Sequence, residues 1–299
     1  MKTRRAYVTM FAFILAFHVC ANEIRMPVDA TSAPGSNHEE FIISRPGIYY
    51  FSTNLVVAHG AGIEIAATNV ILDLNGFALV GDYKGVYIPQ GFQGGYGTGL
   101  YIPAGSSNVV IRNGTICGWN GFAINCFADN VTFEYLAISS NAFGMACDYP
   151  GSDGQRYWIN ALATNGVNSN WVYSSSGVVV RNCRADHNGF TGICIGDNGV
   201  VSGCLSTSNL GNGISVHGSG CLIISNSCIG NNKGNYLRTA GIAVSGDNNR
   251  IEGNRVSGTG VAGDGISIPY SADSVSNPTN NIIIRNFVEG NGIRNYFIN

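Results

Sequence analysis

Short runs of β-branched and aliphatic residues alternate along this chain with polar turns rich in Asn and Gly. Within residues 181–232 one sequence motif repeats. Its copies are marked by Asn182, Gly203 and Asn226, which are 21 and 23 residues apart. A fixed period in the twenties is typical of solenoid proteins, in which each repeat stacks on the one before it. The pattern therefore predicts an all-β solenoid of roughly eight or nine coils.

One strand of each repeat has the form Gly-apolar-x-apolar. Because the side chains of a strand alternate between its two faces, the two apolar residues should face a core and the middle residue should face outward. The outward residues expected from this pattern are Glu64, Tyr101, Ala123, Ala146, Cys194, Ser215, Ala243 and Ser267. They predict a flat surface of mostly small side chains with little acid–base chemistry.

A second family of β-branched strands lies between these, and most of its members end at Asn or Gly. Stacked Asn side chains can hydrogen-bond from coil to coil, and Gly tolerates the positive φ that a tight corner requires. The expected corner residues are Asn75, Asn113, Asn182, Gly203, Asn226, Gly253 and Asn286, with Tyr135 as an exception. These residues are interpreted as structural corners.

The N-terminal residues divide into three segments. Residues 1–21 combine Lys2, Arg4 and Arg5 with a short apolar run and a small-residue cleavage site, which predicts a secretory signal peptide. Residues 22–40 are polar and predict a flexible leader. Residues 41–51 predict strands that cap the first coil of a single domain spanning 41–299, because an open solenoid end would expose strand edges. No later segment is apolar for long enough to cross a membrane.

Composition limits the choice of partner. The chain has 16 Lys and Arg against 18 Asp and Glu, and its basic residues are scattered, which argues against a nucleic-acid partner. Glycine accounts for 41 of 299 residues, about twice the usual share, as many tight corners require.

Eight cysteines follow the predicted signal peptide. Export would permit disulfides, and Cys183 with Cys204 is the best-placed pair, since they occupy the same repeat position one coil apart. Free, buried thiols are nevertheless the favoured interpretation, because cysteine often serves as a small apolar core residue. No paired Cys-x-x-Cys spacing indicates a zinc site.

With strands and corners placed, the chain resembles the right-handed parallel β-helix proteins of the pectin lyase-like class. The resemblance rests on the Gly-Ile-x-Ile strands and on phrases such as Val70-Ile-Leu-Asp-Leu-Asn-Gly-Phe77. It covers about Phe41 to Asn299 and implies a single right-handed parallel β-helix. The class includes pectate and alginate lyases, polygalacturonases, mannuronan epimerases and surface adhesins, so that the fold alone does not decide the function.

The hydrolase pattern of this class is not complete here. Gly263-Asp-Gly-Ile266 and Val216-His-Gly218 look like parts of the polygalacturonase motif, but their order is reversed and the adjacent acidic pair is missing. A carboxylate-driven hydrolase needs a partner acid across the scissile bond.

A lyase needs a base beside a substrate carboxylate, and a cation or Ca²⁺ to stabilise the charge that develops. Arg181, Arg184, Asp186 and His187 could supply the base and the cations, and they are the candidate catalytic residues. The arginine motif of pectate lyases and the Asp-Pro-His-Asp of epimerases are both absent, and solvated turn residues are the alternative interpretation.

A long insertion, Asp148 to Ser176, precedes these residues. Insertions in a solenoid are extruded as loops and often form the binding face. The candidate substrate-binding residues of this loop are Asp148, Tyr149, Asp153, Arg156, Tyr157 and Trp158. The alternative for the aromatic side chains is packing within the loop.

Two functions follow as hypotheses. The first is an exported protein, secreted, periplasmic or on the cell surface, that binds carbohydrate or has a structural role without a catalytic centre. The second is a polysaccharide lyase or related enzyme acting on uronic-acid polymers between the loop and residues 181–187. A monomer without a resident cofactor or metal is expected, with Ca²⁺ only if the protein is a lyase.

Overall fold

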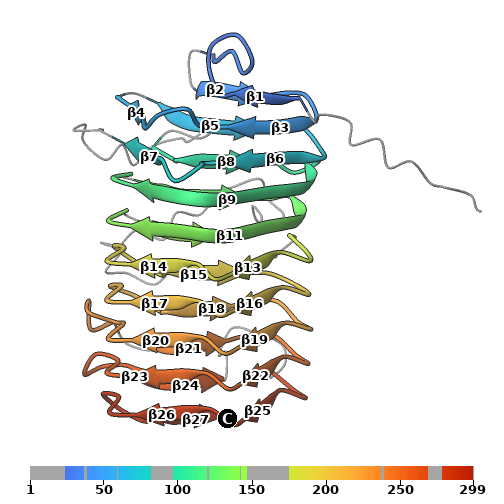
Figure 1. The fold of residues 1–299 in the computed structure, drawn as a ribbon. Coiled ribbons are helices and arrows are strands. Elements are labelled where there is room, and N and C mark those ends of the chain that lie inside the picture. The colour runs from blue at the N-terminus through green and yellow to red at the C-terminus, as the bar shows by residue number, and fades with distance from the viewer. Residues whose placement is uncertain are drawn as a thin grey trace, which may run out of the picture.

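The computed structural model describes residues 24–36, 39–58, 60–81, 97–119, 121–141, 143–146, 175–236, 239–268 and 278–298. Its strands stack as the coils of a parallel β-helix, running from the blue N-terminal end to the red C-terminal end in Figure 1. No helix in the described ranges is long and apolar enough to cross a membrane.

A ten-stranded parallel sheet forms one side of the coils. Its strands are β2 (Glu39–Ile43), β5 (Ala61–Ile65), β8 (Leu100–Ile102), β10 (Phe122–Cys126), β12 (Phe143–Ala146), β15 (Ile193–Ile195), β18 (Ile214–Val216), β21 (Ala240–Val244), β24 (Asp264–Ile268) and β27 (Tyr296–Ile298). Each of the eight predicted Gly-apolar-x-apolar segments contributes residues to one of these strands. Ile193, Ile214, Ile242 and Ile266 are fully buried, which confirms the predicted core face.

A seventeen-stranded sheet forms the rest of each coil and bends at a corner. The strands before the bend are β1 (Arg25–Pro27), β3 (Gly47–Tyr50), β6 (Val70–Asp73), β13 (Val179–Arg181), β16 (Val200–Ser202), β19 (Leu222–Ile224), β22 (Arg250–Glu252) and β25 (Ile282–Ile284). Those after it are β4 (Leu55–Val57), β7 (Ala78–Gly81), β14 (Arg184–Asp186), β17 (Leu205–Thr207), β20 (Ser227–Ile229), β23 (Arg255–Ser257) and β26 (Phe287–Glu289), while β9 (Ser107–Cys117) and β11 (Asp129–Ser139) run through the bend.

The N-terminal end requires a correction. Residues 22–40 were expected to form a flexible leader, but Arg25–Pro27 form β1, which pairs in parallel with β3. Val28 and Ala33 are buried against the core. The reason is that the first coil would otherwise expose both the edge of β3 and its own apolar interior.

The corner between the two halves of the larger sheet adopts positive φ, as predicted for Asn75, Asn113, Asn182, Gly203 and Gly253. Tyr135, the exception in the sequence column, adopts the same conformation with φ of 55°. Two predicted positions are shifted by one residue, since Ser225 and Arg285 hold the positive φ in place of Asn226 and Asn286.

Asn226 and Asn286 instead point into the coil and form a ladder with Asn254. Each amide Nδ2 donates to a backbone carbonyl one coil back, from Asn226 to Val201 at 2.9 Å and from Asn254 to Ile223 at 2.8 Å. Successive amides are also bonded to each other at 3.0 Å. The predicted stacking of Asn between coils is thereby confirmed.

Cys183 and Cys204 occupy this ladder column in the two preceding coils as free, buried thiols. Their sulfurs contact the carbonyl oxygens of Phe133 and Val180 at 3.6 and 3.5 Å, as the Asn amides do in later coils. The two cysteines thus fill the position that asparagine fills elsewhere.

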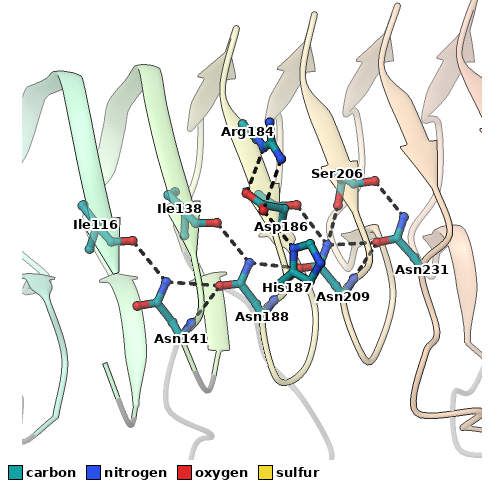
Figure 2. Close-up of polar contacts among 11 residues, drawn as sticks. Ile116, Ile138, Asn141, Arg184, Asp186, His187, Asn188, Ser206, Asn209 and Asn231 are labelled. Atoms are coloured by element: carbon teal, nitrogen blue, oxygen red, sulfur yellow. Dashed lines mark hydrogen bonds and ion pairs between the residues drawn. The ribbon is translucent and has the colours of Figure 1, made fainter. Parts of the chain in front are cut away.

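A second ladder, not expected from the sequence, lines the corner that follows β14. It consists of Asn141, Asn188, Asn209 and Asn231, joined by Nδ2–Oδ1 hydrogen bonds of 3.1, 2.9 and 2.9 Å (Figure 2). Their amides also donate to carbonyls of the preceding coils, such as that of Ala185 at 3.1 Å. All four side chains are buried, and each satisfies backbone groups that the corner removes from the strand ladders.

The glycines that open the Gly-apolar-x-apolar strands make room for this ladder. A Cβ at Gly213 would lie 2.7 Å from Nδ2 of Asn231 and 2.6 Å from the carbonyl oxygen of Gly241. A Cβ at Gly192 would lie 2.7 Å from Nδ2 of Asn209. All three distances are shorter than real Cβ contacts, so the repeated Gly is a packing requirement of the repeated Asn.

We predict that Asn209→Ala lowers the free energy of unfolding by about 2–5 kcal/mol, because it leaves several buried partners without a hydrogen bond. Chemical denaturation should measure this loss. Ser202→Ala, a partly exposed position in the same coil, is the control and should change stability by less than about 0.5 kcal/mol. Equal effects of the two substitutions would contradict the importance of the ladder.

We also predict that Gly213→Ala destabilises the protein by about 1–3 kcal/mol through overpacking against Asn231 and Gly241. The added methyl group and the Asn231 side chain compete for the same space. Gly213→Ala should therefore lower the free energy of unfolding less in the Asn231→Ala variant than in the wild type. Additive effects in a double-mutant cycle would show that the two residues do not compete.

Candidate functional site

Arg181, one of the predicted catalytic residues, lies at the end of β13 and forms an ion pair with Glu134 of the preceding coil. Its Nε donates to Glu134 Oε2 at 2.7 Å, and the Glu134 side chain is largely buried. An equivalent pair joins Arg112 to Asp73 at 3.1 Å two coils earlier. Asp73, Arg112, Glu134 and Arg181 occupy one strand register. Arg181 is therefore part of a column of alternating charges that neutralise each other.

Arg184, Asp186 and His187 form a separate cluster on the other side of the corner at Asn182. Arg184 donates to Asp186 at 3.0 and 3.3 Å, and His187 Nδ1 lies 2.9 Å from Asp186 Oδ2 (Figure 2). Arg184 and Asp186 lie on strand β14, and His187 lies at the corner directly after it, so the three residues cluster at the end of a strand.

Asp186 is the anchor of this cluster. Burial alone would raise the pKa of its carboxyl, but the hydrogen bonds from His187 and Arg184 and their positive charges outweigh burial and lower the pKa below its ordinary value. The carboxylate is consequently ionised at neutral pH and occupied by two donors.

His187 lies at the corner itself, where its backbone has a φ of 52°. Its side chain is 65% exposed, while the next residue, Asn188, is fully buried in the ladder. The imidazole is thus oriented through Nδ1 by Asp186 and directs the rest of its ring toward solvent. This geometry would suit a general base, although the ring lies on an exposed corner.

The structure does not bring the four predicted catalytic residues into one centre. Arg181 precedes the corner at Asn182 and is neutralised by Glu134, whereas Arg184 follows the corner and is neutralised by Asp186. The predicted substrate-binding residues Asp148, Tyr149, Asp153, Arg156, Tyr157 and Trp158 lie outside the described residues. Across the described ranges, no group of three His, Cys, Asp or Glu side chains is placed to hold a metal ion.

The strand register places the predicted outward residues of the ten-stranded sheet in one column except at β10. The later members of this column are buried, so they do not form the open surface that the sequence predicts. Ile124 pairs with Leu100 rather than Ile102, so that Asn125, and not Ala123, lies beside Tyr101. Ala123 instead occupies the glycine position of its strand and is fully buried. The sequence interpretation placed this strand two residues out of register, because a shift of two preserves the alternation of faces.

The same column continues through Cys194, Ser215, Ala243 and Ser267, which are all small. The Ser215 hydroxyl lies 2.9 Å from Nε2 of His217, a residue that the sequence interpretation considered only within the hydrolase motif. Burial lowers the pKa of His217 to about 4, so its imidazole is neutral at neutral pH.

Comparison with known proteins agrees with this architecture. Residues 159–297 match the family model described as a right handed beta helix region. The crystal structure of an alginate lyase from Paenibacillus sp. str. FPU-7 is 12% identical and superposes with a TM-score of 0.53, covering 86% of each chain. No curated protein sequence matches this chain.

Two further solved structures superpose less closely. The A-module of the mannuronan C-5 epimerase AlgE6 of Azotobacter vinelandii is 12% identical, with a TM-score of 0.47 over 92% of this chain and 85% of that one. The surface protein and adhesin PfbA of Streptococcus pneumoniae is 15% identical, with a TM-score of 0.42 over 81% of this chain and 77% of that one. The alginate lyase, at 12% identity, shows a shared fold alone, and the fold of this chain is a right-handed parallel β-helix.

Proposed function

We propose that this protein is an exported, monomeric module that binds a polysaccharide on its surface and has no catalytic centre of its own. The observation that carries the proposal is the pairwise neutralisation of the candidate charges. Arg181 is bound to Glu134, and Arg184 is bound to Asp186, on opposite sides of a corner. A lyase requires cationic groups that are available to a substrate carboxylate, and these cations already have carboxylate partners.

The shape of the molecule supports a long ligand. The ten strands of the smaller sheet are spaced by about 4.8 Å, so its outer face is about 43 Å long. Cys194, Ser215, Ala243 and Ser267 of this face are small and buried. Glu64 and Tyr101, nearer its N-terminal end, are partly exposed, and an extended chain could lie across that part of the face. A polysaccharide ligand also agrees with the similarity in fold to an alginate lyase.

The predicted signal peptide of residues 1–21 supports export to the periplasm, the cell surface or the medium. Free cysteines do not conflict with this location, because the described cysteines other than Cys117 are buried in the coils.

A second candidate function is a lyase or related enzyme acting on uronic-acid polymers. The observation in its favour is the Asp186–His187 pair, in which a carboxylate orients an imidazole whose remaining ring atoms face solvent. In that case Ca²⁺ would be needed to stabilise the developing charge, since the nearby arginines are paired.

We predict that the purified protein binds polysaccharides in affinity electrophoresis but forms no unsaturated product, followed by ultraviolet absorbance, from alginate, polygalacturonate or other uronic-acid polymers with or without Ca²⁺. His187→Ala should leave binding unchanged. Product formation that His187→Ala abolishes would contradict the proposal and establish the second candidate.

We further predict that Asp186 acts as a structural anchor with a distinct pH dependence. Because its pKa is lower in the folded protein than the ordinary value of 3.8, its contribution to stability is present above that value and is lost as the pH falls through the folded pKa. Asp186→Asn should therefore lower the melting temperature at pH 7, and the difference from the wild type should shrink below about pH 4. Glu289→Gln, at an exposed position, should show no such pattern, and a pH-independent difference for Asp186→Asn would contradict this role.

A further inference from the structure

Three polar side chains lie side by side on the outer face of the ten-stranded sheet, near its N-terminal end. Glu64 of β5 is in register with Tyr101 of β8, and Tyr101 is in register with Asn125 of β10. Parallel strands are spaced by about 4.8 Å, so Glu64 and Asn125 flank the tyrosine at nearly equal distances. The three residues form one continuous row, which we call the Glu64–Tyr101–Asn125 row.

Asn125 is the unusual member of the row. Its exposure is only 8%, yet its side-chain amide makes no hydrogen bond to any described residue. A buried amide without a partner destabilises the folded state, and most such groups in native proteins have a partner. Asn125 keeps 8% of its surface exposed, in register with the partly exposed Tyr101. A ligand hydroxyl group that reached this surface could supply both a donor and an acceptor.

Tyr101 adds an aromatic surface next to this amide. Its ring packs edge-on against Phe127, with ring centroids 5.9 Å apart and an interplanar angle of 75°. The side chain is half-buried, so Phe127 fixes its orientation while part of the ring remains accessible. Aromatic rings combine an apolar face with a polar tip, and the apolar face of a sugar ring can pack on such a surface.

Glu64 determines which sugars are compatible with the row. Its side chain has no ion-pair or hydrogen-bond partner within the described ranges. Burial, together with the negative charge of Glu39, raises the pKa of its carboxyl above the ordinary value. A second carboxylate placed beside it would meet electrostatic repulsion, whereas the hydroxyl groups of a neutral sugar could donate hydrogen bonds to it.

We propose that the Glu64–Tyr101–Asn125 row is a binding subsite for a neutral sugar unit of a polysaccharide. Tyr101 supplies the stacking surface, and Glu64 and Asn125 bind hydroxyl groups on either side of it. This inference rests on the proposed function of polysaccharide binding and narrows the ligand to neutral rather than uronic-acid chains.

The test is isothermal titration calorimetry of the full chain with cellohexaose, xylohexaose and mannohexaose as neutral probes and with hexamers of guluronate and galacturonate as acidic probes. We expect at least one neutral probe to bind, and the acidic probes to bind at least 10-fold more weakly. Tyr101→Ala and Asn125→Ala should each weaken neutral binding at least fivefold. Ser267→Ala, in the same outward column on β24, is the matched control and should not change it.

The melting temperature of the Asn125→Ala variant distinguishes a binding role of Asn125 from a structural role. Asn125→Ala removes an unpartnered amide, so the melting temperature of the unliganded protein should stay the same or rise while affinity falls. Binding that none of the row variants weakens would overturn the subsite and leave the proposed function intact. Preference for the acidic probes would likewise overturn the neutral-sugar assignment. Failure to bind any of the five probes in calorimetry, together with failure to bind any polymer in affinity electrophoresis, would overturn both proposals.

Discussion

The fold depends on how the corners of each coil satisfy their backbone groups. At a corner the chain leaves the strand ladder, and its carbonyl groups are buried with no strand partner. Asn141, Asn188, Asn209 and Asn231 solve this problem at one corner, and Asn226, Asn254 and Asn286 solve it at another. Each amide binds a carbonyl of the coil before it, and each amide except the last of its ladder also binds the amide of the coil after it, so that successive coils fix each other's position.

The ladders also explain why the repeat has the sequence that it has. A corner asparagine needs space beside it, and Gly192 and Gly213 provide that space because even one methyl group would collide with an amide. The residue before a ladder position must adopt positive φ, which accounts for His187, Ser208 and Gly230 at one corner. The Gly-Ile-x-Ile strands and the Asn-rich turns are therefore two parts of one packing arrangement.

Local patterns predicted the coil architecture well because each repeat contacts mainly its neighbours. The buried isoleucines and the corner at Asn182 are direct consequences of alternation and of positive φ. The register of β10 was wrong, because a shift of two residues keeps every side chain on its own face and only the neighbouring coil distinguishes Asn125 from Ala123. The ladder at Asn209 was missed because its residues follow the strands after the bend, β14, β17 and β20, and the sequence patterns did not predict these strands.

The site was harder to predict than the fold. Arg181 and Arg184 are three residues apart, which suggested a shared centre, but the intervening corner turns their side chains onto different parts of the sheet. Glu134, which neutralises Arg181, lies 47 residues away along the chain. No local pattern in the sequence indicates a partner at that distance. The pairing of Arg181 with Glu134 follows only from the stacked register of the coils.

Backbone hydrogen exchange at the ladder corners tests the central claim most directly. The amide N–H groups of Asn188 and Asn209 donate to side-chain oxygens of Asn209 and Asn231 at 3.0 and 3.3 Å, and not to a strand. If the ladders hold the coils together, these amides should exchange as slowly as those of the buried strands β15 and β18. Exchange at the rate of exposed turns would contradict the account.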